Sequence, residues 1–350
     1  YLHYKSKNPQ DRFTLASTKS MMHRYHISIS AIESSYYTSR LEDDRVGYFT
    51  TMYQDYSKTL KEDPYVRYIN RWDLRKQNPH EKLSKPVEPI VYWLENTIPK
   101  EFRPAVTKGI LGWNKAFEKL GFVDAIVVKQ MPDDATWDPA DVRYNTIRWI
   151  VQPESAYAVG PSRANPYTGE LYDADIRISN DYVRFYFDDY VNFIDPLLSE
   201  KSIEDIWQEG HDHHDHDKSM TCNYGEYLKH KMSFTWNYLV SNNMVGDSNE
   251  EMMRFVEDGI VDLLLHEVGH TLGLRHNFKA SSVFSVEELS NPSFTDMYGV
   301  TGSVMDYNAT NLLDGGHNYF QTKPGPYDYW AIEYGYAVQP EGSNMTNDEW

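Results

Sequence analysis

The sequence predicts an α+β protein. In it, a β-rich N-terminal segment precedes a domain built on a twisted mixed five-stranded sheet, a backing helix and a second long helix. Two observations predict this class. Apolar and polar residues alternate in short stretches of the first 85 residues, and the remaining chain gives the order strand, helix, four strands, helix. The 350 residues, 40% of them hydrophobic, suffice for one large domain or two modest ones.

The N-terminal segment comprises residues 1–85. Its alternation is clearest at residues 26–32 and 46–53, where we expect strands. Residues 85–89 contain two prolines, which fix φ and remove backbone donors, so neither a central strand nor a helix can continue through them. We therefore place a boundary there, with the N-terminal segment as part of a larger domain and residues 86–350 as the second domain.

The second domain begins with a strand and a helix. Residues 90–94 form a short apolar run, and residues 103–120 have apolar side chains at spacings of three and four, with Pro104 near the start and Gly121 at the end. These side chains are Val106, Ile110, Trp113, Phe117 and Leu120. Four more strands are expected at residues 125–128, 144–151, 156–162 and 171–179, with a turn at 165–169.

The second long helix follows an insertion. Residues 181–247 mix aromatic and acidic residues without a sustained period, so we expect short elements there. A helix is predicted from residue 248 to about 272, because Ser248 and Glu251 have the spacing of a capping box. Its apolar face consists of Val261, Leu264, Leu265, Val268 and Leu272.

Residues 266–276, at the end of this helix, read His-Glu-Val-Gly-His-Thr-Leu-Gly-Leu-Arg-His. On a helix, His266 and His270 lie one above the other, opposite the apolar face, so both imidazoles can reach one metal ion. If the helix continued, His276 would lie about 9 Å further along the axis, whereas a zinc–nitrogen bond is about 2 Å. The helix must therefore end first, and Gly273 can end it because glycine adopts left-handed backbone at little cost.

Three histidines leave a tetrahedral zinc ion with one open position, as in a catalytic site. Cys222 is the only cysteine, so neither an intrachain disulfide nor a thiolate zinc cluster can form. The sequence thus predicts a zinc site made by His266, His270 and His276, with Glu267 beside the ligands.

The pattern H-E-x-x-H-x-x-G-x-x-H resembles that of the metzincin metallopeptidases, the clan that includes astacins, matrixins and adamalysins. That clan has a methionine turn beneath the metal, and residues 303–307, Ser-Val-Met-Asp-Tyr, are similar to it, with Gly302 before them and Met305 as the methionine. Residues 326–332 resemble the C-terminal helix of the clan, and the order of elements in residues 90–179 is similar to its upper subdomain.

A closer likeness covers nearly the whole chain. Residues 45–49, 112–117, 160–163 and 168–170 resemble a family of large secreted bacterial zinc metalloproteases of poorly known substrate. The likeness implies a protein or peptide substrate, a secreted, periplasmic or cell-surface location, and more chain on either side, although no signal peptide is recognisable here. Asn277 departs from several subfamilies of the clan, which have an acidic residue or serine there, so the subfamily stays open.

The resemblance implies hydrolysis of peptide bonds. Zinc lowers the pKa of its bound water to about 7; Glu267 takes the proton of that water as it attacks a peptide carbonyl, then gives the proton to the leaving amine. Tyr307 lies where astacin-like members carry a tyrosine that ligates zinc or stabilises the oxyanion; a structural hydrogen bond is an equal alternative. Residues 156–162 are a candidate edge strand for an extended substrate.

Several alternatives stay open. The chain could be a catalytically silent zinc-binding or scaffold protein, although a structural site normally closes its fourth position with a protein ligand instead of keeping a glutamate such as Glu267 nearby. It could also be a zinc hydrolase of a non-peptide amide. Asp173 and Asp175 could bind Ca²⁺, or be solvated or salt-bridged. Residues 211–217, His-Asp-His-His-Asp-His-Asp, could bind a second metal ion or form a solvated loop.

Charge and hydropathy argue against two other classes. The 52 acidic and 34 basic residues give a net charge of -18, which would repel phosphate backbones, so nucleic acid is not an expected partner. No run approaches 18 apolar residues, so no membrane-spanning helix is expected. The sequence leaves the oligomeric state open.

Overall fold

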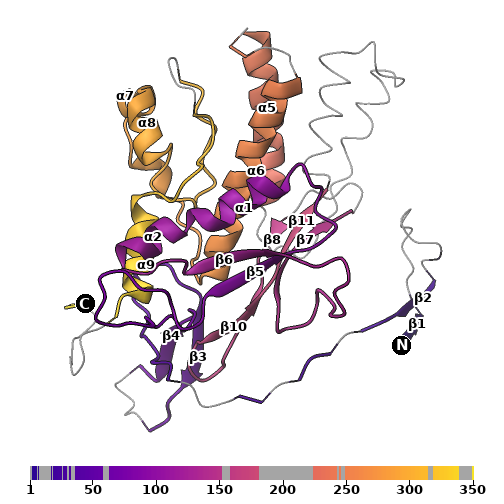
Figure 1. Ribbon diagram of the computed structural model, residues 1–350, viewed down its shortest axis with the longest axis vertical. Helices are drawn as coiled ribbons and strands as arrows, with labels where there is room; N and C mark the ends of the chain where they lie inside the picture. Colours follow the sequence, from indigo (N-terminus) through magenta and orange to yellow (C-terminus); the bar gives the residue numbers. More distant parts are fainter. Residues whose placement is uncertain are drawn as a thin grey trace.

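The computed structural model has a mixed α+β architecture, which confirms the predicted class (Figure 1). The structure describes residues 2–5, 7, 17, 19–25, 27–29, 31–32, 36–57, 63–151, 158–180, 224–242, 244–245, 249–313, 318–338 and 349–350. Among these residues, no helix combines the length and apolar character needed to cross a membrane.

A five-stranded sheet lies at the centre of the molecule (Figure 1), in the order β6-β5-β7-β11-β8. The strands are β5 (Ile90–Leu94), β6 (Ile126–Gln130), β7 (Asn145–Ile150), β8 (Ala158–Val159) and β11 (Ile176–Ser179). The pairs β5–β6, β5–β7 and β7–β11 are parallel, and β8 runs antiparallel to β11 at the edge. Alternate residues of β5 are buried and the two between them are half-buried, so both faces of this strand are covered, as is usual in parallel sheets.

The two strands predicted at residues 156–162 and 171–179 are each divided, and the four shorter strands form two separate pairs. Strand β8 pairs with β11, whereas β9 (Ser162–Ala164) and β10 (Leu171–Ala174) form a separate two-stranded sheet. Between them, the carbonyl of Pro161 accepts the backbone N–H of Asp175 at 3.1 Å. Because proline has no N–H, the ladder cannot continue through this point on both strands.

Two short helices take the place of the single helix predicted at residues 103–120. They are α1 (Arg103–Gly112) and α2 (Asn114–Lys119). The break falls at Trp113, which keeps helical dihedral angles and whose indole Nε1 donates to the carbonyl of Leu265 at 2.9 Å. The interruption thus coincides with an anchor to the second long helix.

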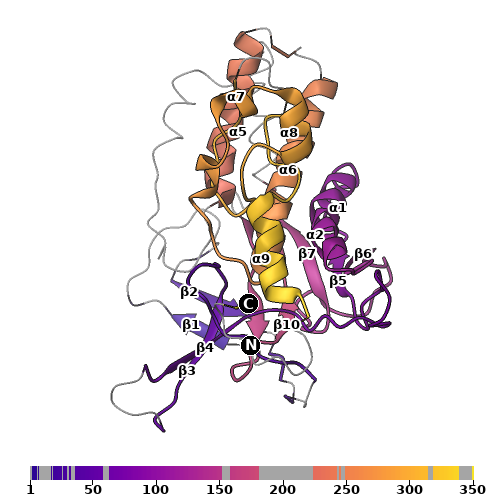
Figure 2. The same cartoon turned by 90° about the vertical axis from the view of Figure 1, so that its left-hand side faces the viewer.

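That second helix, α6 (Asn249–Thr271), confirms the helix predicted to begin near residue 248. A Cβ added to Gly109 of α1 would lie 2.6 Å from the Cβ of Leu264, so glycine permits a close approach of the two helices. Figure 2 shows α6 between α5 and α1. Every residue from 259 to 274 is buried, so the second half of α6 is surrounded by protein on all sides.

Helix α5 (Tyr224–Ser241) corrects the prediction that residues 181–247 contain only short elements. Its buried side chains recur at helical spacing and include two polar ones. They are Tyr224, Leu228, Lys231, Met232, Thr235, Trp236 and Leu239. The helix packs against α6. Residues 181–223 of the predicted insertion lie outside the described residues.

The N-terminal segment contains two two-stranded sheets. They are β1 (Leu2–Lys5) with β2 (Ser20–His23), and β3 (Thr50–Gln54) with β4 (Tyr65–Ile69). The strand predicted at residues 46–53 therefore begins at Thr50. The strand predicted at 26–32 is wrong for the described residues of that range, where Ile27 and Ile29 are 79% and 94% exposed. Alternation alone does not make a strand, because a neighbouring strand and a covering core must stabilise it.

Part of the N-terminal segment lies against the loop that follows α6. The backbone N–H of Phe49 donates to the carbonyl of Gly273 at 2.7 Å. The backbone N–H of Arg275 donates to the carbonyl of Gly47 at 2.9 Å. The loop between the second and third histidines is therefore hydrogen-bonded to a stretch of chain far away in the sequence.

The remaining helices among the described residues follow this loop. They are η4 (Ala280–Ser282), α7 (Val286–Leu289), α8 (Pro292–Tyr298) and α9 (Pro326–Tyr336). Helix α9 begins where the sequence predicted a C-terminal helix, at residue 326, and packs against α2 (Figure 2). The domain boundary at residues 85–89 stays a prediction.

Candidate metal centre

Helix α6 ends where the spacing of the histidines requires. Gly273 has a φ of 100°, in the left-handed region. Its N–H donates to the carbonyl of His270 at 3.0 Å, and the N–H of Leu274 donates to the carbonyl of Gly269 at 3.0 Å, which together form a Schellman motif. A Cβ at position 273 would also overlap the carbonyl oxygen of Asn70. Glycine is therefore required both for the backbone conformation and for the close contact.

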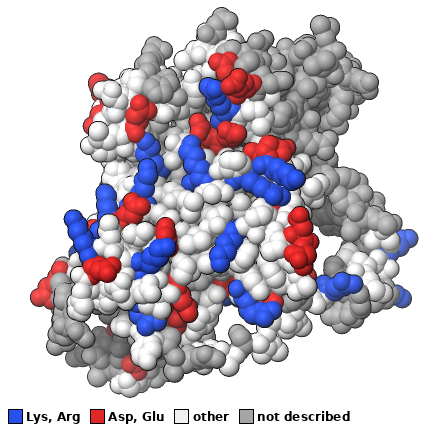
Figure 3. Space-filling model, viewed as in Figure 1, with Lys and Arg blue, Asp and Glu red and all other residues white. Residues whose placement is uncertain are grey.

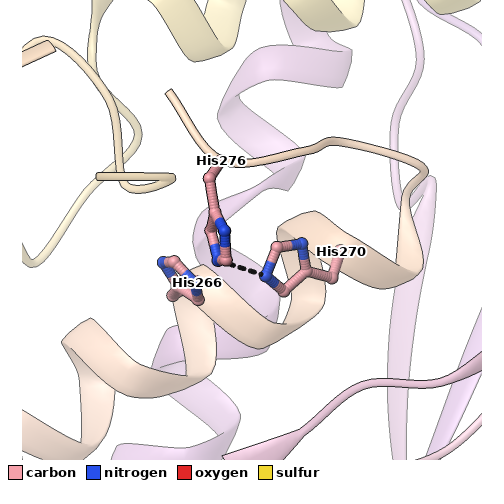
Figure 4. Close-up of side chains that lie close together, drawn as sticks. All are labelled: His266, His270 and His276. Carbon is pink, nitrogen blue, oxygen red and sulfur yellow. Dashed lines mark hydrogen bonds between the residues drawn. The ribbon is translucent and has the colours of Figure 1, made fainter. Parts of the chain in front are cut away.

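The chain reversal brings His276 to face the two histidines of α6 (Figure 4). One ligand nitrogen from each of the three side chains lies within 4.8 Å of the others. The Nε2 atoms of His270 and His276 are 3.1 Å apart. Two nitrogens bound to one tetrahedral zinc ion at about 2.0–2.1 Å lie about 3.3 Å apart. The structure therefore brings the three predicted ligands together at a spacing that suits one metal ion.

Backbone carbonyls fix the orientation of both helical histidines. The Nδ1 atom of His266 lies 2.7 Å from the carbonyl oxygen of Val304, and that of His270 lies 2.8 Å from the carbonyl oxygen of Leu274. A carbonyl can only accept, so each Nδ1 carries the hydrogen and each Nε2 keeps its lone pair. Metal-binding histidines usually donate their second ring N–H in this way.

Burial lowers the pKa of all three imidazoles. The pKa of His266 lies well below its usual 6.5 through desolvation and the neighbouring histidines, and desolvation lowers that of His270 to about 4. The pKa of His276, which is half-buried, is lowered by desolvation and by the charge of Arg275. The rings are therefore neutral at pH 7, which is the form that binds a metal ion.

Glu267 is fully buried and lies beside the end of β8. A Cβ added to Gly160 would lie 2.8 Å from the carbonyl oxygen of Glu267 and 3.5 Å from its Oε2 atom. Only a glycine lets the chain pass this close to the helix. The predicted general base is thus next to the edge strand predicted at residues 156–162, of which residues 158–162 are described.

Met305 is buried beneath α6. A Cβ on Gly269 would overlap its sulfur atom and lie 2.9 Å from the ring of Trp113. The carbonyl of Met305 accepts the backbone N–H of Asn277, the residue after the third histidine, at 2.9 Å. Met305 therefore contacts the helix between the first two histidines and the residue that follows the third, Asn277.

Asp328 of α9 holds the chain that supports the first histidine. Its carboxylate accepts hydrogen bonds from the Ser303 hydroxyl at 2.6 Å and from the backbone N–H groups of Val304 and Gly325 at 2.8 and 2.7 Å. Burial raises the pKa of Asp328 to about 6, although these hydrogen bonds lower it. The carbonyl of Val304 in turn accepts the Nδ1–H of His266. The Asp328 carboxylate therefore connects α9 to the first histidine of the candidate metal centre.

Tyr307 lies beside the histidines as part of an aromatic group. Its ring centroid is 4.8 Å from that of His276 and 5.6 Å from that of His266. Phe278 and Tyr227 flank the same ring at 5.1 and 5.7 Å. The position is consistent with a role at the metal, and the role itself stays a prediction.

Sequence reasoning missed three residues behind the first histidine: Tyr224 and Lys231 of α5, and Asp262 of α6. All three are buried, and the ring of Tyr224 stacks on His266. One signal was present in the sequence. Asp262 interrupts an apolar run of α6 one helical turn before His266, and a buried carboxylate of this kind requires polar partners.

The other predicted metal sites gain no support. Asp173 forms an ion pair with Arg163, and the Oδ1 atom of Asp175 accepts the backbone N–H and the hydroxyl of Thr146 at 3.1 and 2.9 Å. Asp173 therefore matches the salt-bridged alternative to calcium binding, whereas Asp175 is buried and hydrogen-bonded to Thr146. The histidine-rich residues 211–217 lie outside the described residues, so their role stays a prediction.

Acidic and basic side chains are interspersed over the face drawn in Figure 3. The net charge of -18 therefore does not appear there as one continuous acidic surface. Charges of both signs also pair locally, as in the contacts of Arg45 with Asp43 and of Arg143 with Asp141.

Two parts of the chain match known families. Residues 248–349, which contain α6, the three histidines, Met305 and α9, match a family model described as Met-zincin. Residues 2–77 match a family described as a domain of unknown function (DUF5117). No curated protein and no solved structure matches the chain. The first match and the histidine cluster together support a zinc peptidase of the metzincin type, without identifying a particular family of that clan.

Proposed function

We propose that this chain is a zinc-dependent endopeptidase in which His266, His270 and His276 hold the metal ion and Glu267 is the general base and acid. The convergence of the three imidazoles carries the proposal, because two of them donate Nδ1–H to a carbonyl and so present Nε2 as the nitrogen that can bind a metal ion. The Met-zincin match over the same residues is independent support.

The donor set suits zinc. His266, His270 and His276 would hold the ion through three neutral imidazole nitrogens, and a catalytic zinc site with three protein ligands would leave room for water or substrate. Zinc held in this way supplies Lewis acidity, which lowers the pKa of water to about 7 and polarises a peptide carbonyl.

Glu267 supplies the proton transfers in this proposal. It directly follows the first ligand on α6, and its carboxylate faces the end of β8 at Gly160. From this position one carboxylate oxygen would accept a proton from the attacking water, and the same group would return that proton to the leaving amide nitrogen. Tyr307, beside His276, is the second candidate, either as a further ligand or as a donor to the oxyanion; the alternative is a purely structural tyrosine.

The position of β8 supports a peptide substrate. This strand pairs with β11 on one side and, among the described strands, has no neighbour on the other. An extended peptide would add to the open edge through backbone hydrogen bonds, with one of its peptide bonds close to Glu267. Backbone pairing recognises an extended chain more than a sequence, so the expected substrates are proteins and peptides.

The same arrangement supports a metzincin-like catalytic domain over residues 86–350, preceded by the β-rich segment 1–85. In this proposal α1 and α2 are the backing helix, α6 is the active-site helix, residues 303–307 are the methionine turn, and α9 is the C-terminal helix. The resemblance to secreted bacterial metalloproteases supports a secreted, periplasmic or cell-surface location.

The test compares the wild-type chain with Glu267→Ala in cleavage of a denatured protein mixture, with zinc content measured in parallel. We expect Glu267→Ala to lower the cleavage rate by about 10²- to 10⁴-fold while one zinc ion per chain stays bound. Glu257→Gln, on the same helix two to three turns earlier, is the matched control and should cleave normally. Full activity in Glu267→Ala would contradict the mechanism.

The wild-type chain also separates the alternatives. An endopeptidase loses cleavage on treatment with a chelator and regains it with zinc. A silent zinc-binding protein would bind zinc through the three histidines without cleaving proteins or small amides. A hydrolase of non-peptide amides would cleave a small acyl amide but no protein.

A further inference from the structure

The first metal ligand has an aromatic ring stacked on its face. The ring of Tyr224, at the start of α5, lies 4.1 Å from the ring of His266, with an angle of 21° between the two planes. Tyr224 is fully buried. Because Val304 already holds the Nδ1 edge of the imidazole, the histidine is restrained both at that edge and on one face.

A carboxylate of the same helix fixes the tyrosine in turn. The hydroxyl of Tyr224 donates to the Oδ2 atom of Asp262 at 2.8 Å. Asp262 is fully buried and lies four residues before His266, on the same side of α6. A single turn of α6 therefore presents both the ligand and the group that anchors the ring stacked on it.

A buried lysine completes the arrangement. The Nζ atom of Lys231 lies 3.5 Å from Oδ2 of Asp262 and donates to the carbonyl of Asn308 at 3.0 Å. Its side chain is 6% exposed, so both members of the pair are removed from water. A buried carboxylate and ammonium are costly to desolvate, and such pairs are weak general sources of stability. Their position one turn from a metal ligand suggests a role beyond packing.

We propose that Tyr224 is a positioning residue for the metal centre. Held by Asp262 and Lys231, it keeps the His266 ring in the orientation in which Nε2 faces His270 and His276. We call Tyr224, Asp262 and Lys231 the His266 clamp. The inference rests on the proposed metal site, but it does not depend on which bond the chain hydrolyses.

The clamp makes α5 part of the metal centre. The two helices that supply it pack against each other, and Lys231 also reaches Asn308, one residue after Tyr307. A displacement of α5 would therefore release the face of His266 and one contact of the loop that carries Tyr307. Metal affinity should depend on residues of α5 that cannot themselves ligate the ion.

The experiment measures zinc affinity in the full chain by competition with a coloured chelator, and the visible spectrum of the Co²⁺-substituted protein. Tyr224→Phe keeps the ring and removes only the hydroxyl, and we expect zinc affinity to fall by about three- to tenfold. Tyr224→Leu removes the stacked ring as well, and we expect a loss of about 10- to 100-fold with a changed Co²⁺ spectrum. The matched control is Tyr238→Leu, at a partly exposed tyrosine of the same helix.

A purely structural role for Tyr224 gives a different result. The melting temperature of the metal-free variants would fall, while their zinc affinities and Co²⁺ spectra stayed at the wild-type values; that result would overturn the proposal. If Tyr224→Leu does not fold, the zinc affinity of Tyr224→Phe alone tests the proposal. If the wild-type chain binds zinc but cleaves no peptide, the proposed function fails and the clamp is still tested. If it binds no zinc, both fail.

Discussion

The sulfur atom of Met305 packs directly against Gly269, the residue that precedes the second histidine on α6. A larger side chain at position 269 would have to displace either this sulfur or the ring of Trp113, which is anchored by its own hydrogen bond to Leu265. The close packing of Met305 beneath the candidate metal centre therefore depends on the absence of a side chain at position 269.

Gly269→Ala should destabilise the protein by about 1–3 kcal/mol, because the added methyl group has no space beside Met305 and Trp113. We expect weaker zinc binding as well, since His270 is the next residue. Urea unfolding with and without zinc measures both effects. Met305→Leu, which nearly conserves volume, serves as the comparison and should cost less than about 1.5 kcal/mol. An unchanged unfolding midpoint in Gly269→Ala would show that the contact is looser than the structure indicates.

Gly273→Ala should separate the third ligand from the first two. Its φ of 100° disfavours any side chain, at a cost of about 1–3 kcal/mol, and the Cβ would overlap the carbonyl of Asn70. Relief of that overlap requires movement of the loop that leads to His276, so zinc affinity should fall together with stability. Gly47→Ala is the control, because a Cβ there meets its nearest neighbour at 3.5 Å, an ordinary contact. Wild-type zinc affinity in Gly273→Ala would contradict the expectation.

The pKa of Asp328 predicts an effect of pH on stability. The folded state raises this pKa from 3.8 to about 6, so the folded chain binds more protons than the unfolded chain between these values. The contribution of Asp328 to the free energy of unfolding therefore increases as the pH falls from about 6 to about 4, by about 3 kcal/mol, and is smallest above pH 6.

Asp328→Asn removes this titration and is the comparison that isolates it. Other groups titrate equally in both proteins, so the difference in free energy of unfolding between wild type and variant is the quantity to follow from pH 7 to pH 4. We expect the wild type to gain relative to Asp328→Asn across this interval. A difference that stays constant, or that changes in the opposite direction, would show that the carboxylate is not buried as described.

Removal of the metal should lower the melting temperature. A ligand that binds only the folded state at 100 times its dissociation constant adds about 2.7 kcal/mol to stability. Differential scanning calorimetry of the chelated protein, before and after addition of zinc, measures this increment. His270→Asn should abolish the zinc-dependent shift, whereas His80→Asn, at an exposed histidine outside the cluster, should keep it. A full shift in His270→Asn would remove that residue from the ligand set.

Local spacing explains which parts of the site could be predicted from the sequence. Two histidines four residues apart share one side of a helix, and a third six residues later requires a chain reversal, so Gly273 follows from helix geometry alone. The carbonyls of Val304 and Leu274 orient the histidine rings. Both residues lie in irregular loops, whose conformations are not predicted by the spacing of apolar and polar residues. These could be found only in three dimensions.

Helix α5 shows a second limit. Its buried face includes Lys231 and Thr235, two polar residues that interrupt the apolar pattern by which an amphipathic helix is recognised. Lys231 is buried because Asp262 and Asn308 lie opposite it, and both belong to other parts of the chain. When a helix buries a charged side chain against residues from other parts of the chain, the sequence of that helix alone does not predict the buried face.

The hydrogen bonds between the N-terminal segment and the loop after α6 have a consequence for how such proteins diverge. The backbone of Tyr48 forms an isolated antiparallel β-bridge with Leu274. The side chain of Tyr48 packs on Gly335 of α9, where an added Cβ would lie 2.7 Å from the ring. Positions 48 and 335 should therefore covary among homologues, a smaller residue at one accompanying a larger residue at the other. Recombination that exchanges residues 248–349 without residues 2–77 would break these pairs, so selection should tend to keep the two segments together.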